Sequence, residues 1–152
     1  MDLLMMFIAT GAGSGNLPVA PGTWGSAVGV LLWLLLSRLG ALPYFAVIGV
    51  LFIIGVFCAG AAEKIVDRGD PAIVVIDEIV GQLIALSLIP ATPLTIFAGF
   101  LLFRFFDIVK PFPVGWIDQH LHGGLGIMLD DVVAGLYALL VLHLGLWLLK
   151  ML

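Results

Sequence analysis

Apolar residues fill long stretches of this chain, and few polar residues interrupt them. Five such stretches stand out, at residues 24–39, 43–62, 79–89, 94–109 and 132–149. A helix crosses a hydrocarbon core of about 30 Å with about 20 apolar residues. We therefore interpret the first, second and fifth stretches as three long membrane spans.

The third and fourth stretches predict a different arrangement. Residues 79–89 are too few to cross the core as a helix, and the sequence PATP at residues 90–93 breaks any helix there. We expect a re-entrant or kinked helical hairpin, whose irregular backbone is tolerated at membrane depth only where protein covers it or water lines it. The predicted fold is all-α: one membrane-embedded domain over residues 1–152, a multi-helix bundle of three long spans plus this hairpin.

The composition agrees with a membrane protein. The chain is 62% hydrophobic and 11% charged, with a mean hydropathy of +1.25, whereas soluble domains are about 25% charged. A net charge of −4 with no basic patch or tail argues against nucleic acid as a partner. The single cysteine, Cys58, excludes a disulfide within the chain.

The charged residues are distributed unequally along the predicted path through the membrane. One side of the path holds most of the acidic residues, namely Asp67, Asp70, Asp77, Glu78, Asp107, Asp118, Asp130 and Asp131. The same side holds Lys64, Arg68, Arg104 and Lys110, against Arg38 and Lys150 on the other. Cytoplasmic segments carry an excess of Lys and Arg, so the acidic side is predicted to face the cytoplasm.

Two acidic pairs occur in similar local sequences, IDEIVGQLIAL at residues 76–86 and LDDVVAGLYAL at residues 129–139. The pairs are Asp77 with Glu78, and Asp130 with Asp131. Acids are favoured at the start of a helix, so N-capping explains one pair as well as a functional role does. Two pairs in a chain so poor in charge favour function.

Small residues follow both pairs. Gly81 and Gly135 lie four positions after Asp77 and Asp131. Residues four apart share a helix face, and glycines on such a face permit close approach of two helices.

The stretch FRFFDIVKPFP at residues 103–113 adds a third group of charges. Arg104 and Asp107 are three positions apart and share one helix face. They can form a simple ion pair at the membrane surface. Alternatively, Asp107 binds a metal ion, and Arg104 or Lys110 binds phosphate.

Carboxylates without cysteine ligands indicate a hard cation, and Mg²⁺ fits best because it takes oxygen ligands from carboxylates, phosphate and water. The candidate ligands are Asp77, Glu78, Asp107, Asp130 and Asp131. One ion needs fewer ligands than this, so the others can hold a second metal, orient water or act as a base. We expect the catalytic residues to be Asp77, Asp107, Asp131 and His122, the last as a general acid.

Two glycine-rich stretches are candidate phosphate loops. GAGSGNLPVAPGTWGS at residues 11–26 is not a Walker loop, because no Gly-Lys-Ser/Thr follows at the required spacing. Glycines let backbone N–H groups approach an anion, so Ser14 and Thr23 are candidate phosphate-binding residues. A turn followed by a helix N-cap explains the stretch equally well. HGGLG at residues 122–126 is a similar but weaker signal.

Four of these motifs together resemble the phosphatidylglycerophosphatase A family. They are GSGNLPVAPGTWGS, IDEIVGQ, FRFFDIVKPFPVGWID and HGGLGIMLDDVVAG, in order over residues 13–135. The resemblance implies a multi-pass, Mg²⁺-dependent phosphatase of the bacterial inner membrane. Its substrate would be the membrane lipid phosphatidylglycerophosphate, hydrolysed to phosphatidylglycerol and phosphate in phospholipid biosynthesis.

Two other interpretations compete with an enzyme. Acidic residues within a membrane often mark ion pathways, so an acid-lined cation or proton carrier is the main alternative. Here the acids gather at one boundary and none lies in the interior of the three predicted long spans, which favours an enzyme acting on a lipid headgroup. A membrane scaffold with capped helices would leave the glycine-rich stretches and the hairpin unexplained.

Overall fold

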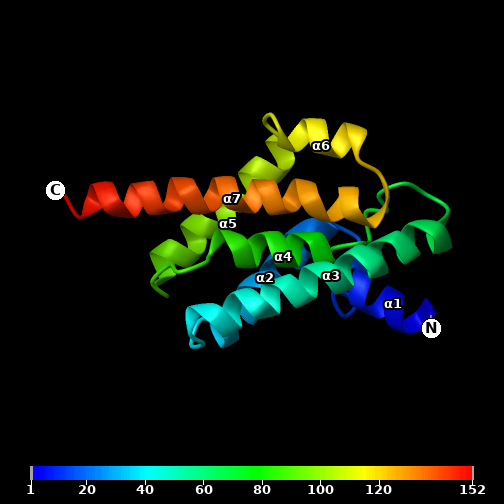
Figure 1. Ribbon diagram of the computed structural model, residues 1–152, viewed down its shortest axis with the longest axis horizontal. Coiled ribbons are helices and arrows are strands. Elements are labelled where there is room, and N and C mark those ends of the chain that lie inside the picture. Colours follow the sequence, from blue (N-terminus) through cyan, green and yellow to red (C-terminus); the bar gives the residue numbers. More distant parts are fainter. Residues whose placement is uncertain (1, 152) are drawn as a thin grey trace.

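The computed structural model describes residues 2–151, which contain seven α-helices, one short 3₁₀ helix and no strand. In chain order these are α1 (Asp2–Ala9), η1 (Ser14–Asn16), α2 (Pro21–Leu36), α3 (Ala41–Val66), α4 (Ile76–Ala85), α5 (Pro93–Val109), α6 (Val114–His120) and α7 (Gly123–Leu149). α7 lies along the longest axis of the molecule, and α3 and α4 run beside it (Figure 1). The predicted all-α fold is confirmed.

Among the described residues, two helices are long and apolar enough to cross a membrane: α3 with 26 residues and α7 with 27. The prediction of three long spans is not confirmed. α2 has 16 residues, which at 1.5 Å per residue gives about 24 Å, less than a hydrocarbon core of about 30 Å. It ends at Leu36 because the polar residues Ser37 and Arg38 interrupt the apolar pattern.

The two long helices leave most of their apolar surface uncovered. Only 28% of the most apolar stretch of α3, and 22% of that of α7, is buried inside the molecule. Large side chains such as Phe57 and Leu140 are more than half exposed. The core helix of a soluble protein would bury these side chains, whereas contiguous exposed apolar surface marks contact with a partner or a membrane. Both helices therefore indicate that the protein associates with a membrane.

The short helix α4 occupies the centre of the bundle. It packs on α2, α3, α5 and α7, and eight of its ten residues are buried. Residues 86–92 connect it to α5, which confirms the predicted interruption at PATP, whereas a re-entrant path through a membrane stays a prediction. The start of α5 is set by Thr92, whose hydroxyl accepts from the backbone N–H of Thr95 at 3.2 Å, with Pro93 in the first turn.

Glycines bring α4 into backbone contact with α7. A Cβ atom on Gly135 would lie 2.5 Å from the carbonyl oxygen of Gly81, and one on Gly81 would lie 2.7 Å from that of Asp131. No other residue fits at this crossing, so the close approach predicted from the spacing of these glycines is confirmed. The crossing lies one helical turn beyond Asp77 and Asp131, and it brings the starts of the two acidic segments together.

Candidate active site

The two acidic pairs occupy different positions in their helices. Asp77 and Glu78 lie in the first turn of α4, after Val75 at the N-cap, and no side chain caps this helix. α7 begins at Gly123, so Asp130 and Asp131 lie about two turns inside it. N-capping therefore does not explain the α7 pair, and the α4 pair makes no side-chain capping bond.

Three carboxylates from these pairs converge. Oxygen atoms of Asp77, Glu78 and Asp131 all lie within 4.8 Å of one another, and we call these residues the carboxylate trio. Each contributes one buried oxygen without a hydrogen-bond partner: Asp77 Oδ1, Glu78 Oε2 and Asp131 Oδ1. Buried carboxylates without partners are costly unless a cation neutralises them or they bind protons. The trio fits a hard divalent cation such as Mg²⁺, which prefers oxygen ligands.

The electrostatics of the trio reflect this crowding. Burial raises the pKa of Asp77 well above its usual range, and the neighbouring charges of Glu78 and Asp131 raise it further. Burial also raises the pKa of Glu78 to about 7. A bound divalent cation would favour the ionised carboxylates and lower both pKa values.

Arg104 and Asp107 of α5 adjoin the trio. The predicted ion pair is present, with Arg104 Nη1 at 2.5 Å from Asp107 Oδ2. The same nitrogen lies 3.9 Å from Glu78 Oε1 and donates to the hydroxyl of Ser26 on α2 at 3.4 Å. Arg104 Nε is buried and has no partner. Arg104 thus connects α5 to both α2 and α4 at the edge of the trio.

The glycine-rich stretch approaches the trio through its second half. A Cβ on Gly22 would clash with Glu78 Oε1 and lie 3.0 Å from Arg104 Nη1. The hydroxyl of Ser26, one turn later, donates to the carbonyl of Gly22 at 2.8 Å. Sequence reasoning did not select Gly22 or Ser26, although their small size in the PGTWGS segment was the available signal.

Ser14 and Thr23, the predicted phosphate-binding residues of this stretch, lie in different surroundings. Thr23 follows Gly22 in the first turn of α2 and is partly buried. Ser14 lies on η1, and its hydroxyl donates to the carbonyl of Gly11 at 3.0 Å rather than reaching the carboxylates. A role of either residue in phosphate binding stays a prediction.

Asp130 joins a second group of charges, around Lys110. The Lys110 ammonium donates to Asp118 Oδ1 at 2.5 Å and to Asp130 Oδ2 at 2.8 Å. Burial lowers the pKa of Lys110, but these two hydrogen bonds outweigh it and raise the pKa above its usual range. Lys110 adopts a left-handed conformation after α5, which turns the chain toward α6.

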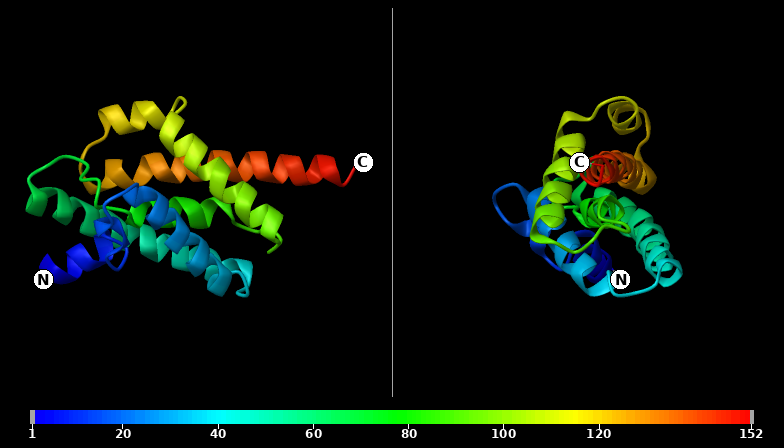
Figure 2. Two further views of the ribbon diagram at one scale, coloured as in Figure 1. Left: turned by 180° about the vertical axis from the view of Figure 1, so that it is seen from behind. Right: turned by 90° about the vertical axis from the view of Figure 1, so that its left-hand side faces the viewer.

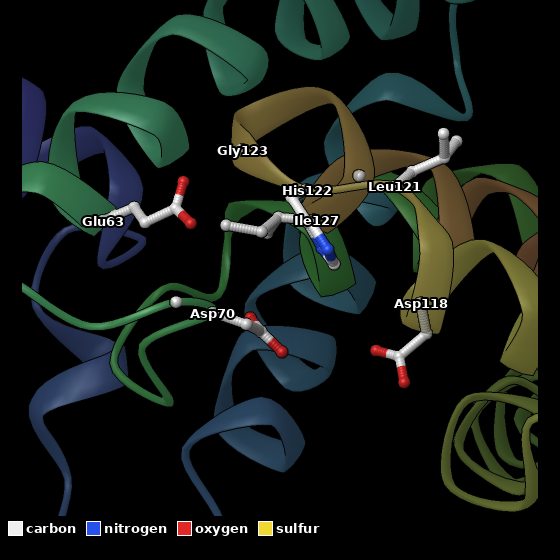
Figure 3. Close-up of a pocket in the computed structure, with 9 residues that line it drawn as sticks. Glu63, Asp70, Asp118, Leu121, His122, Gly123 and Ile127 are labelled. Carbon is white, nitrogen blue, oxygen red and sulfur yellow. The ribbon is translucent and has the colours of Figure 1, made fainter.

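A cavity of about 100 Å³ opens beside this second group. Glu63, Asp70, Asp118 and His122 contribute its polar lining, and Figure 3 shows Asp70, Asp118 and His122 directed into the same space. Burial raises the pKa of Asp70. His122, the predicted general acid, is the N-cap residue of α7 and lines this cavity rather than contributing to the trio.

Comparison with known proteins now identifies the family. The model of the family described as phosphatidylglycerophosphatase A matches residues 7–146. The chain belongs to the phosphatidylglycerophosphatase A family. This confirms the resemblance found in the sequence, and with it the prediction of a phosphatase.

Curated relatives cover most of the chain. The phosphatidylglycerophosphatase A of Haemophilus influenzae is 43% identical over 136 residues, which are 88% of this chain and 83% of that protein. The protein of the same name from Escherichia coli is 37% identical over 137 residues, 90% of this chain and 80% of the relative. A putative phosphatidylinositol-3-phosphatase of Bacteroides thetaiotaomicron is 38% identical over 156 residues, 96% of each chain. No solved structure matches the chain significantly.

In this member of the phosphatidylglycerophosphatase A family, the predicted site residues other than Ser14 and Thr23 form two neighbouring groups. The first group is the carboxylate trio with Arg104 and Asp107. The second comprises Lys110, Asp130 and His122, together with residues that sequence reasoning left out of the site: Asp118, Asp70 and Glu63. The two groups meet on α7, where Asp130 and Asp131 are adjacent.

Proposed function

We propose that this protein hydrolyses phosphatidylglycerophosphate to phosphatidylglycerol and phosphate, with Mg²⁺ held by Asp77, Glu78 and Asp131. The observation that carries the proposal is the buried carboxylate trio with the Arg104 guanidinium beside it. Two relatives named phosphatidylglycerophosphatase A support the substrate. When bound, Mg²⁺ would stabilise the negative charge that develops on the phosphoryl oxygens in the transition state.

Arg104 and Lys110 are the phosphate-binding residues of this proposal. A guanidinium presents paired N–H donors that match two oxygens of a phosphate group, and Arg104 Nε has no other partner. Lys110 acts as a point charge on the other side of Asp130 and Asp131. Its pairing with Asp118 and Asp130 keeps the ammonium charged and restrains it.

The reaction requires two proton transfers. An attacking water forms the new P–O bond and loses one proton to a carboxylate oxygen, for which Asp107 is the candidate because Arg104 holds it at the edge of the trio. The P–O bond to the glycerol headgroup breaks, and the leaving oxygen takes a proton from His122 at the adjoining cavity. The proton gained by Asp107 then returns to His122 through solvent, so the OH of water is now on phosphate and its other hydrogen is on the released glycerol hydroxyl.

We also propose that the protein is a multi-pass protein of the bacterial inner membrane with its site on the cytoplasmic side. α3 and α7 would cross the bilayer, and α4 and α5 would form a hairpin within it. The support is the excess of Lys and Arg on the side of the site. A Gln119→Cys variant in a Cys58→Ala background tests this, because Gln119 is exposed on α6 and Cys58 is buried. Labelling by an impermeant reagent only after permeabilisation is expected, and labelling of intact spheroplasts would reverse the orientation.

Phosphate release by the purified protein tests the activity. The substrates are phosphatidylglycerophosphate, phosphatidylinositol 3-phosphate and phosphatidic acid, each with Mg²⁺ and after exhaustive chelation. We expect turnover of phosphatidylglycerophosphate with Mg²⁺ only. A preference for the inositol lipid would transfer the headgroup assignment to the activity named for the Bacteroides relative. Full activity after chelation would remove the metal from the proposal.

A further inference from the structure

An apolar groove runs between α2 and α5. The two helices pack side by side and in opposite directions, as Figure 2 shows in the view from behind. The groove has a volume of about 370 Å³, and we name it the α2–α5 groove. Its walls are Ala27, Val30 and Leu31 of α2 and Ile96, Phe97 and Phe100 of α5. These lining residues are apolar, and Leu31 and Phe97 are more than half exposed at its mouth.

One end of this groove lies next to the phosphate-binding group of the candidate site. Phe100 precedes Arg104 by one helical turn on α5, and Ala27 directly follows Ser26 on α2. The contact of Arg104 Nη1 with Ser26 Oγ at 3.4 Å joins the two helices at this end. A polar site that contains the Arg104 guanidinium therefore adjoins an apolar groove, in the same order as the phosphate and the acyl chain of a lipid.

We propose that the α2–α5 groove holds an acyl chain of the lipid substrate while its phosphate lies at Arg104. The inference rests on the proposed function, and it adds the path by which the substrate enters: sideways from the bilayer, between α2 and α5. The lining from Pro93 to Phe100 covers eight residues of α5, and seven rises of about 1.5 Å each give a length of about 10 Å. That length accommodates the upper part of one acyl chain.

The other apolar groove near α5 does not meet these conditions. It lies between α5 and α7, with Ala98, Leu102 and Val141 in its lining. Val141 is ten residues beyond Asp131 on α7, about 15 Å along the helix axis. Phe103 of α5 and Ala138 of α7 are fully buried in one apolar cluster, and neither lines this groove. A chain in the α5–α7 groove would therefore be separated from a phosphate at Arg104.

Photolabelling of the wild-type protein tests the position of the chain. The probe is phosphatidylglycerophosphate with a diazirine in the middle of one acyl chain, incorporated into vesicles of phosphatidylethanolamine and phosphatidylglycerol. We expect the label on peptides of α2 and α5 that line the groove, and competition by unlabelled substrate. Label confined to α3 or to the α5–α7 groove would overturn the proposal. This readout does not require hydrolysis.

A bulky substitution gives an independent test. Ala27→Trp fills the groove near Ser26, and Ala46→Trp, on an exposed position of α3, is the matched control. We expect Ala27→Trp to lower kcat/KM for the long-chain lipid at least tenfold and to leave hydrolysis of the deacylated substrate within twofold. Ala46→Trp should change neither. Equal losses on both substrates, or a changed oligomeric state that points to a second copy in the groove, would overturn the proposal. Wild-type protein inactive on every substrate would instead refute the proposed function, and the photolabel would still locate the chain.

Discussion

The two acidic pairs have similar local sequences but different surroundings. Both acids of the α4 pair, Asp77 and Glu78, belong to the carboxylate trio. The α7 pair is divided: Asp131 joins the trio, and Asp130 binds Lys110. Consecutive residues on a helix point about 100° apart. α4 has neighbours on all sides, so both of its acids stay inside, whereas only one acid of α7 can face α4.

Conservative substitutions in the α7 pair give the most direct test of the different roles of Asp130 and Asp131. Asp131→Asn should lower kcat by about 10²–10³-fold, the usual loss when one electrostatic group leaves a preorganised site. Asp130→Asn should lower kcat only about tenfold, because the amide oxygen can still accept a hydrogen bond from Lys110. A hydrogen bond to a charged group is worth about 1.5–3 kcal/mol. The measurement is turnover across a Mg²⁺ titration, with thermal unfolding recorded for both variants. Equal losses would mean that the division of the pair has no functional meaning.

The glycine crossing that positions the pairs can be disturbed separately. Gly135→Ala places a Cβ 2.5 Å from the carbonyl oxygen of Gly81, a backbone atom that cannot move aside alone. α4 and α7 must separate, and a displacement of about 1 Å at a site can cost about 10²-fold in rate. The matched control is Gly145→Ala on the same helix, where an added Cβ meets nothing within 4 Å. We expect lower activity and a lower unfolding temperature for Gly135→Ala only; parallel behaviour of the two variants would disprove the crossing.

The raised pKa of Glu78 should also make the stability of the protein depend on pH. Glu78 has a pKa raised from 4.5 to about 7, so the folded protein holds a proton that the unfolded chain releases. That stabilisation is complete below pH 4.5 and disappears as the pH rises through about 7. The metal-free protein should therefore unfold at lower temperature at pH 8 than at pH 5, and Mg²⁺ should restore stability at pH 8. Glu78→Gln should flatten the profile, and an unchanged slope in that variant would assign the effect to another group.

The smallest effect on activity is expected for a substitution at Gln82, which lies in α4 one helical turn beyond Glu78. Gln82 is fully buried, and neither atom of its amide has a hydrogen-bond partner. An unsatisfied buried polar group costs about 1–3 kcal/mol, and Met has a similar shape without that cost. Gln82→Met should keep activity within twofold and raise the free energy of unfolding by about 1 kcal/mol. A tenfold loss of activity would make Gln82 part of the site.

Several parts of this fold follow from local patterns. The long apolar stretches predict α3 and α7, and the PATP sequence predicts the interruption between α4 and α5. The spacing of Gly81 and Gly135 predicts the helix crossing. The prediction of a third long span is not confirmed, because α2 ends at Leu36. The sequence did not predict α1 or α6, because both are short and depend on packing, α1 against α3 and α6 against α7.

The sequence by itself determined which residues are candidates for the site, namely a few carboxylates with Arg104 and Lys110, and it placed glycines where helices touch. Only the tertiary structure decided which of them act together. Asp130 and Asp131 are neighbours in sequence. Asp130 accepts a hydrogen bond from Lys110 at the end of α5, whereas Asp131 lies beside Asp77 and Glu78 of α4. Likewise Gly22 and Ser26 of α2 reach Glu78 and Arg104 across more than fifty residues of chain. The physical reason is that helix periodicity sets the direction of each side chain, whereas its partner is supplied by whichever helix packs on that face.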